Sequence, residues 1–340
     1  MIDNREKLEQ YRNQGQTFCP YLFVHYHLDT DKASKLCCHA SSNIAKTQID
    51  FMDPLYNDLR KKSMDNQQLP GCNRCYEAED NGFTSLRQRC IDDQLSDSAK
   101  TNYLVNTIDD WAAGKDIQPN WYDLRISNNC NLSCIMCGPQ YSSTWAKEVG
   151  EDDTHLLYEP EITINPDTIK MQLAGGEPFM IKKFVKILQQ IEDFRCEIIV
   201  NTNATIVTKP LLDELKRFRN VHIVVSIDGP DEINTMIRKG SNWETIKKNI
   251  KLFQDYGFNV LVNTVLQKDN INYIYNLGTQ IEDLGIDDWI IMPLFVPENL
   301  KWKEQQHIDY KGIEKTTKLY SVKRNENSLS LLQHVLKEKI

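Results

Sequence analysis

The stretch Cys130-Asn131-Leu132-Ser133-Cys134-Ile135-Met136-Cys137 decides how the rest of the chain is interpreted. Its three cysteines have the spacing C-x3-C-x2-C, and no fourth cysteine adjoins them. Thiolates are soft ligands that suit iron–sulfur clusters, zinc and copper(I). A closed structural zinc site takes four ligands, usually in paired C-x2-C loops. Three close thiols instead indicate a cubane cluster with one iron open to a substrate or cofactor, and a zinc loop or a chance cluster is the alternative.

This stretch resembles the cluster-binding loop of the radical S-adenosylmethionine (SAM) enzymes. The resemblance implies that Cys130, Cys134 and Cys137 hold a [4Fe–4S] cluster whose open iron binds the amino and carboxylate groups of SAM. It also implies that SAM is cleaved to a 5′-deoxyadenosyl radical, which abstracts a hydrogen from the substrate. Met136 departs from the family, which usually has an aromatic residue there, but methionine also packs well on an adenine ring.

Length and composition set the broad class of the protein. The 340 residues suffice for one large domain or two ordinary ones, and 40% hydrophobic with 26% charged residues is typical of a globular protein. No run of about 18 apolar residues predicts a membrane span, and the charged N-terminus lacks the apolar core of a signal peptide. We therefore expect a cytoplasmic protein, in which ten cysteines more often bind metal or act in catalysis than form disulfides. The net charge of −8 argues against binding to long nucleic acid.

From about residue 121 the pattern alternates between strands and helices. The expected strands cover residues 121–127, 168–174, 197–201, 222–227, 259–266 and 289–292. The expected helices cover residues 142–149, 182–194, 210–218, 243–256 and 273–284. Such alternation predicts a parallel α/β sheet, in which ligands bind at the carboxyl ends of the strands. The family resemblance makes this sheet a partial (β/α)6 barrel.

We expect three domains: an auxiliary-cluster domain over residues 1–118, a radical SAM core over 119–300 and a helical extension over 301–340. The first is predicted to be largely irregular. Its expected elements are a helix over 4–13, a strand over 21–28 that pairs in a hairpin with 36–39, and a helix over 49–63. The extension is charged and shows no residues that indicate chemistry.

The motif Gly175-Gly176-Glu177-Pro178 follows the second expected strand of the core. Two glycines let a ligand approach the backbone closely, and the glutamate offers an anionic acceptor. The motif resembles the family's GGE motif, which implies that Glu177 holds the methionine ammonium of SAM. At the end of the third strand, Asn203 matches a position that helps to bind SAM, although a turn cap is the alternative.

The fourth strand ends in Ser226-Ile227-Asp228-Gly229-Pro230, and Arg238 follows twelve residues after Ser226. This arrangement resembles the SxDGP…R pattern of the sulfatase-maturating and peptide-modifying branch, which implies that Ser226 and Arg238 contact SAM. A guanidinium suits a carboxylate because it makes strong, often bidentate hydrogen bonds. We interpret Asp228 as a turn residue. Val265 on the fifth strand matches an apolar edge that packs on adenine, and ordinary strand core is an equal alternative.

A second cysteine set lies near the N-terminus, at Cys19, Cys37, Cys72 and Cys75. It resembles the auxiliary-cluster module called a twitch or SPASM domain, which implies a second [4Fe–4S] cluster. The module usually follows the core and has a glycine where this chain has Lys32. By spacing we prefer Cys37 to Cys38 as a ligand. A four-cysteine zinc site is the alternative.

These observations predict a radical SAM enzyme with an auxiliary cluster that relays an electron or anchors the substrate. An external donor such as flavodoxin or ferredoxin would reduce the first cluster. A peptide or protein substrate is favoured by the SxDGP…R pattern, with an amino sugar or a nucleotide as alternatives. Two other functions remain open, namely a methylthiotransferase-like enzyme acting on a nucleotide or RNA, and a non-catalytic iron–sulfur or zinc module. Cys90 is interpreted as an ordinary cysteine in preference to a hydrogen donor.

Overall fold

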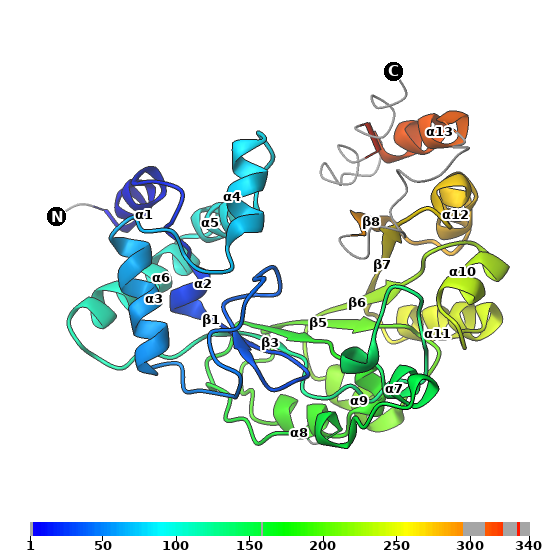
Figure 1. The fold of residues 1–340 in the computed structure, drawn as a ribbon, viewed down its shortest axis with the longest axis horizontal. Coiled ribbons are helices and arrows are strands. Elements are labelled where there is room, and N and C mark those ends of the chain that lie inside the picture. The colour runs from blue at the N-terminus through cyan, green and yellow to red at the C-terminus, as the bar shows by residue number, and fades with distance from the viewer. Residues whose placement is uncertain (1–2, 158, 295–309, 322–331, 334–340) are drawn as a thin grey trace. The chain divides into compact units, whose positions relative to one another are not determined.

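The computed structural model describes residues 3–157, 159–294, 310–321 and 332–333. The chain divides into two compact units (Figure 1). The first comprises Met1–Ile126, Pro160–Gln172 and Gln190–Cys196, and the second comprises Ser127–Glu159, Leu173–Gln189 and Glu197–Ile340. The predicted division into three domains stays a prediction. Among the described residues, none of the helices has both the length and the apolar character of a membrane span.

The first unit is mainly helical, so the prediction of a largely irregular segment over 1–118 is wrong. Its helices are α1 (Asn4–Asn13), α2 (Tyr21–Val24), α3 (Pro54–Met64), α4 (Asn73–Asp80), α5 (Leu86–Ser96) and α6 (Ser98–Ala112). Side-chain caps begin two of the missed helices: Ser85 and Gln88 form a capping box on α5, and the Asp97 carboxylate accepts from two backbone N–H groups of α6. Helices α1, α5 and α6 pack on one another.

The strands of this unit run in the order β2-β1-β3-β4, with β1 (His25–Leu28), β2 (Ser34–Lys35), β3 (Trp121–Leu124) and β4 (Lys170–Leu173). The expected strand over 21–28 is wrong in its first half, which is helix α2, and its partner is β2 rather than 36–39. The helix expected over 49–63 begins only at Pro54, where Asp53 caps it. Lys32, at the usual glycine position of the hairpin, has a φ of 64°, in the left-handed region that favours glycine.

The second unit confirms the parallel α/β fold expected for the core. Its parallel strands follow the order β5 (Glu197–Thr202), β6 (Asn220–Ser226), β7 (Asn259–Leu266) and β8 (Asp288–Pro293). The helices are α7 (Ser143–Val149), α8 (Lys183–Leu188), α9 (Lys209–Leu215), α10 (Asp231–Ile237), α11 (Trp243–Asp255), α12 (Ile274–Asp283) and α13 (Tyr310–Ser321). Helix α8 is shorter than the expected 182–194, and α10 was not expected. Apart from α13 and residues 332–333, the predicted extension lies outside the described residues.

Strand periodicity explains which side chains of this sheet are accessible. Along β7, Val262, Thr264 and Leu266 are fully buried, whereas Asn263 and Val265 on the opposite face are half-buried. The register places Asn263 beside Ser226 of β6, and Val265 beside Met292 of β8. The half-buried face at the carboxyl ends of β6–β8 therefore carries two residues that the sequence predicts to contact SAM, Ser226 and Val265.

Candidate functional site

The loop Cys130–Cys137 lies in the second unit and is fixed by its own backbone. The N–H of Ser133 donates to the Lys239 carbonyl at 3.0 Å, and that of Ile135 donates to the Ile237 carbonyl at 2.9 Å. The Trp145 indole N–H donates to the Cys134 carbonyl at 2.7 Å. The loop is thus held between the end of α10 and the beginning of α7, which restricts the positions of its three thiols.

The three thiols are partly buried, and hydrogen-bond donors lie close to their sulfur atoms. Cys134 is buried, and Cys130 and Cys137 are half-buried. Asn203 Nδ2 lies 3.9 Å from Cys130 Sγ, and Arg238 Nη1 lies 4.0 Å from Cys134 Sγ. Burial raises the pKa of Cys130 to about 12 and that of Cys134 to about 11, although Arg238 opposes the shift at Cys134. Metal binding must therefore release these protons, and the nearby donors suit the negative charge on cluster sulfurs.

The glycine motif places the end of β4 against the beginning of the cysteine loop. The N–H of Gly176 donates to the Ser127 carbonyl at 2.9 Å, and that of Glu177 donates to the Asn129 carbonyl at 2.7 Å. A Cβ at residue 176 would lie 2.3 Å from the Asn129 oxygen, so only glycine fits there. Gly175 has a φ of 118°, a conformation that L side chains rarely adopt.

Glu177 is fully buried next to the same loop. Its carboxylate accepts from the Thr202 hydroxyl at 2.7 Å and from the Asn203 N–H at 2.8 Å. Burial nonetheless raises the pKa of Glu177 to about 7. The Asn203 side chain donates to Asn131 Oδ1 at 3.1 Å. Two residues that were predicted from separate motifs, Glu177 and Asn203, are therefore joined to each other and to the cysteine loop.

Arg238 is oriented by Asp228, which lies in the turn between β6 and α10 as interpreted but also has this second role, not foreseen from the sequence. Arg238 Nε lies 2.8 Å from Asp228 Oδ2, and the Asp228 side chain is 0% exposed. The other carboxylate oxygen accepts from the Val265 N–H at 2.8 Å. Asp228 thus links Arg238 to the end of β7. Its ten-residue spacing from Arg238 was visible in the sequence, but burial of both charges was not.

The structure also locates the remaining predicted contacts to SAM. Ser226 is the last residue of β6, and its hydroxyl makes no hydrogen bond with any described residue. Met136 is half-buried within the cysteine loop, and Val265 is half-buried near the end of β7. These positions leave the three side chains partly accessible to a ligand.

The four N-terminal cysteines line one cavity of the first unit. Cys19, Cys37, Cys72 and Cys75 all contribute to its wall, together with Tyr76 and Arg87. Cys38 is exposed and does not line this cavity, which supports the choice of Cys37 made from spacing. Burial raises the pKa of Cys19 and Cys37, and the charges of neighbouring thiols add to both shifts. Four convergent thiols fit either a fully ligated cluster or a zinc ion.

Arg87 is a residue of this cavity that the sequence analysis missed. Its guanidinium pairs with both oxygens of Glu79, at 3.0 and 2.6 Å, and donates to the Phe18 carbonyl at 3.0 Å. Both side chains are buried, at 7% and 3% exposure. The pair joins α5 to α4 beside Cys75, and the contact with Phe18 fixes the segment next to Cys19. Cys90, also on α5, is buried and does not line the cavity.

The comparisons with known proteins agree with this geometry. Residues 124–277 match the family model described as the Radical SAM superfamily, so the chain contains a radical SAM domain. The family implies a [4Fe–4S] cluster and SAM, and the thiols and buried polar groups described above fit both.

Three proteins illustrate what the chain is similar to. A tungsten-containing aldehyde ferredoxin oxidoreductase cofactor-modifying protein of Pyrococcus furiosus is 26% identical over 182 residues, which are 50% of each chain. The subtilosin biosynthesis protein AlbA of Bacillus subtilis is 27% identical over 47% of this chain and 36% of its own length. Among solved structures, SuiB of Streptococcus suis bound to the precursor peptide SuiA has a TM-score of 0.44 and 15% identity, over 74% of this chain and 58% of SuiB. The chain spans about half the length, or less, of these curated relatives.

Proposed function

We propose that this protein is a radical SAM enzyme that abstracts a hydrogen atom from its substrate. The observation that carries the proposal is the assembly of Glu177, Asn203 and Arg238 around the three-cysteine loop. A [4Fe–4S] cluster with bound SAM supplies a 5′-deoxyadenosyl radical by reductive cleavage. Cys130, Cys134 and Cys137 hold that cluster.

The other predicted residues bind and orient SAM. Arg238 binds the methionine carboxylate through the part of its guanidinium that Asp228 leaves free, and Glu177 accepts the methionine ammonium. Asn203 and Ser226 supply further polar contacts. Met136 and Val265 pack on the adenine, while Gly175 and Gly176 let the ligand and the loop approach the backbone.

The test is SAM cleavage by anaerobically purified protein in the presence of a strong reductant. We expect 5′-deoxyadenosine from the wild type and none above background from a Cys130→Ala, Cys134→Ala, Cys137→Ala variant. Cys196→Ala, at a buried cysteine outside both cysteine sites, is the matched control. If the wild type held zinc in place of iron after anaerobic reconstitution, the proposal would be refuted. A non-catalytic zinc module would then be the remaining interpretation.

We further propose that Cys19, Cys37, Cys72 and Cys75 ligate a second [4Fe–4S] cluster, which makes residues 1–118 an auxiliary-cluster domain. Full ligation by four thiols suits electron relay from a substrate radical better than direct binding of substrate. We expect about eight irons per chain in the wild type. A Cys72→Ser, Cys75→Ser variant should retain about four of them. About four irons and one zinc in the wild type would reduce this site to a structural role.

For the substrate we propose a peptide or protein, modified in the cytoplasm with flavodoxin or ferredoxin as the electron donor. The support is the SxDGP…R pattern at Ser226 and Arg238, together with the similarity to AlbA, a bacteriocin biosynthesis protein. The net charge of −8 disfavours the alternative of an RNA substrate. Deuterium transfer from a labelled peptide library into 5′-deoxyadenosine tests this, and transfer only from nucleotides would contradict it.

A further inference from the structure

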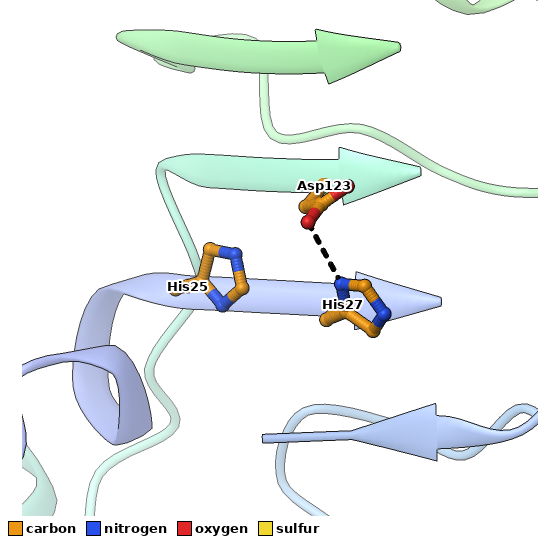
Figure 2. Close-up of side chains that lie close together, drawn as sticks. All are labelled: His25, His27 and Asp123. Carbon is orange, nitrogen blue, oxygen red and sulfur yellow. Dashed lines mark ion pairs between the residues drawn. The ribbon is translucent and has the colours of Figure 1, made fainter. Parts of the chain in front are cut away.

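Three potential metal ligands converge in the first unit, outside both cysteine sites. His25 and His27 are two residues apart on β1, so their side chains point to the same face of the sheet. Asp123 on the neighbouring strand β3 is in register with His27. One donor atom from each of the three side chains lies within 4.8 Å of the other two (Figure 2). All three residues are buried, at 2%, 1% and 2% exposure.

The orientation of the His25 imidazole suits metal binding. His25 Nδ1 lies 3.2 Å from the Leu36 carbonyl, so a proton on this nitrogen leaves the lone pair on Nε2. In Figure 2, the other ring nitrogen of His25 points to the side of Asp123. A backbone carbonyl that accepts the second N–H is the usual support of a metal-binding histidine. Edge contacts with the rings of Tyr21 and Trp121, at centroid distances of 4.6 and 5.0 Å, hold the His25 ring in this position.

One oxygen of the Asp123 carboxylate accepts no hydrogen bond and could bind a cation. Its Oδ2 lies 3.0 Å from His27 Nδ1. Its Oδ1 is buried and accepts no hydrogen bond, and the Arg125 guanidinium lies 3.6 Å away from it. Buried carboxylate oxygens in proteins nearly always have a hydrogen-bond donor or a metal ion as a partner. Ion pairs with His27 and Arg125 therefore account for the charge of Asp123, but they leave the lone pair of His25 and the hydrogen-bonding capacity of Oδ1 unused.

We propose that His25, His27 and Asp123 bind one divalent transition-metal ion, at a site separate from both cysteine sites. Two imidazoles and one carboxylate are a ligand set that proteins use for zinc and for non-haem iron(II). Two ligands placed 2.0–2.2 Å from a tetrahedral zinc ion are roughly 3.3 Å apart, close to the separation between His27 and Asp123. The inference does not depend on the radical SAM proposal, because none of the three residues takes part in it.

The test is metal analysis of the full chain after both cysteine sites have been filled with iron and sulfide under anaerobic conditions. Zinc is then added and excess removed, and cobalt(II) is used in a parallel titration. We expect about one added ion per chain. The cobalt(II) spectrum should lack thiolate charge-transfer bands, because the donors are nitrogen and oxygen.

The decisive variant is His25→Phe, which keeps the aromatic contacts and the His27–Asp123 pair but removes one ligand. Binding should weaken by more than the roughly 10–100-fold expected for the loss of a supporting partner. Asp123→Asn, similar in shape, is the second variant and should have the same effect. The matched control is His222→Asn, because His222 also lies near a carboxylate, 3.6 Å from Glu197. A Cys72→Ser, Cys75→Ser variant should keep the added ion.

Three outcomes would overturn the proposal. One is the absence of an added ion in the wild type. Another is an ion that remains in both His25→Phe and Asp123→Asn. The third is an ion that disappears with the cysteines, which would assign it to the four-cysteine cavity.

Discussion

The two cysteine sites differ in how their ligands are supplied. The three thiols of the second unit come from one eight-residue loop, whereas the four thiols of the first unit come from segments between Cys19 and Cys75. Both sites nevertheless have a buried arginine–carboxylate pair beside a cysteine, Arg238–Asp228 in one and Arg87–Glu79 in the other. The cysteines of one site are close together in the sequence and those of the other are far apart, whereas both sites have the same kind of buried ion pair.

Removing cysteines from one site at a time should have the largest effect and separates the two sites. Loss of Cys130, Cys134 and Cys137 should abolish SAM cleavage and remove about four irons, while loss of Cys72 and Cys75 should remove about four irons and leave SAM cleavage intact. Iron analysis and a 5′-deoxyadenosine assay on both variants measure this. If either variant lost all iron, the two sites would not be independent.

Breaking the buried ion pairs tests whether the two sites are supported in the same way. Asp228→Asn and Glu79→Gln should each destabilise the protein by about 3–5 kcal/mol, because each leaves a buried guanidinium without its counter-ion. Asp213→Asn, which breaks an exposed pair with Lys209, should cost at most about 1 kcal/mol. Thermal unfolding of the iron-loaded proteins gives the comparison. Equal shifts for the buried and exposed pairs would contradict it.

Gly176→Ala should disturb the three-cysteine site alone. The new Cβ meets the backbone oxygen of Asn129, and such overpacking costs about 1–3 kcal/mol. SAM cleavage should fall because the loop that carries Cys130 must shift. The control is Gly150→Ala, where no atom lies within 4 Å of the new Cβ and only the strain of a positive φ is added. Unchanged iron content and SAM cleavage in Gly176→Ala would show that the loop tolerates the displacement.

The smallest expected effect is a pH dependence caused by Glu177. Its pKa is about 7 in the folded protein against an ordinary value of 4.5, so the folded state holds the proton more tightly than the unfolded state. The resulting stabilisation is complete below pH 4.5 and is lost as the pH rises through 7. Between pH 6 and pH 8 the loss should be about 1.4 kcal/mol.

Glu177→Gln should lack this decline, so the variant gains stability relative to the wild type as the pH rises from 6 to 8. Glu148→Gln is the control, because hydrogen bonds from Lys239 and Ser133 hold the pKa of Glu148 below its ordinary value. Unfolding temperatures of the three proteins across this pH range provide the measurement. Parallel curves for the wild type and Glu177→Gln would contradict the shift.

Local patterns predicted the core of the fold well. The alternation of apolar residues over 259–266 coincides with β7, because one face of that strand is buried and the other is not. Tyr21–Val24 was misassigned, because its aromatic and β-branched residues favour a strand while the structure places them in a short helix after Pro20. Helices α5 and α6 were missed, although Ser85 and Asp97 are recognisable caps.

The sequence predicts only those parts of the candidate site whose residues lie close together in the chain. The cysteine loop and the Gly175–Glu177 motif each carry their own spacing, and the positions of Cys19, Cys37, Cys72 and Cys75 indicated one metal site. The supporting roles of Asp228 and Arg87 depend on burial and on partners distant in sequence, which no local pattern reports. The convergence of His25, His27 and Asp123 likewise depends on the register between β1 and β3.

The wide sequence spacing of the four-cysteine cavity has a consequence for how the protein matures. Cys19 precedes α2, Cys37 follows β2, and Cys72 and Cys75 lie at the beginning of α4, so these ligands meet only after the surrounding segments have folded. A cofactor bound in this cavity, as proposed above, would therefore be inserted late in biogenesis. Once in place, such a cofactor would act as a cross-link and should protect the segment between Cys37 and Cys72 from proteolysis. The eight-residue loop imposes no such order, so a cluster held there would load independently of the first unit.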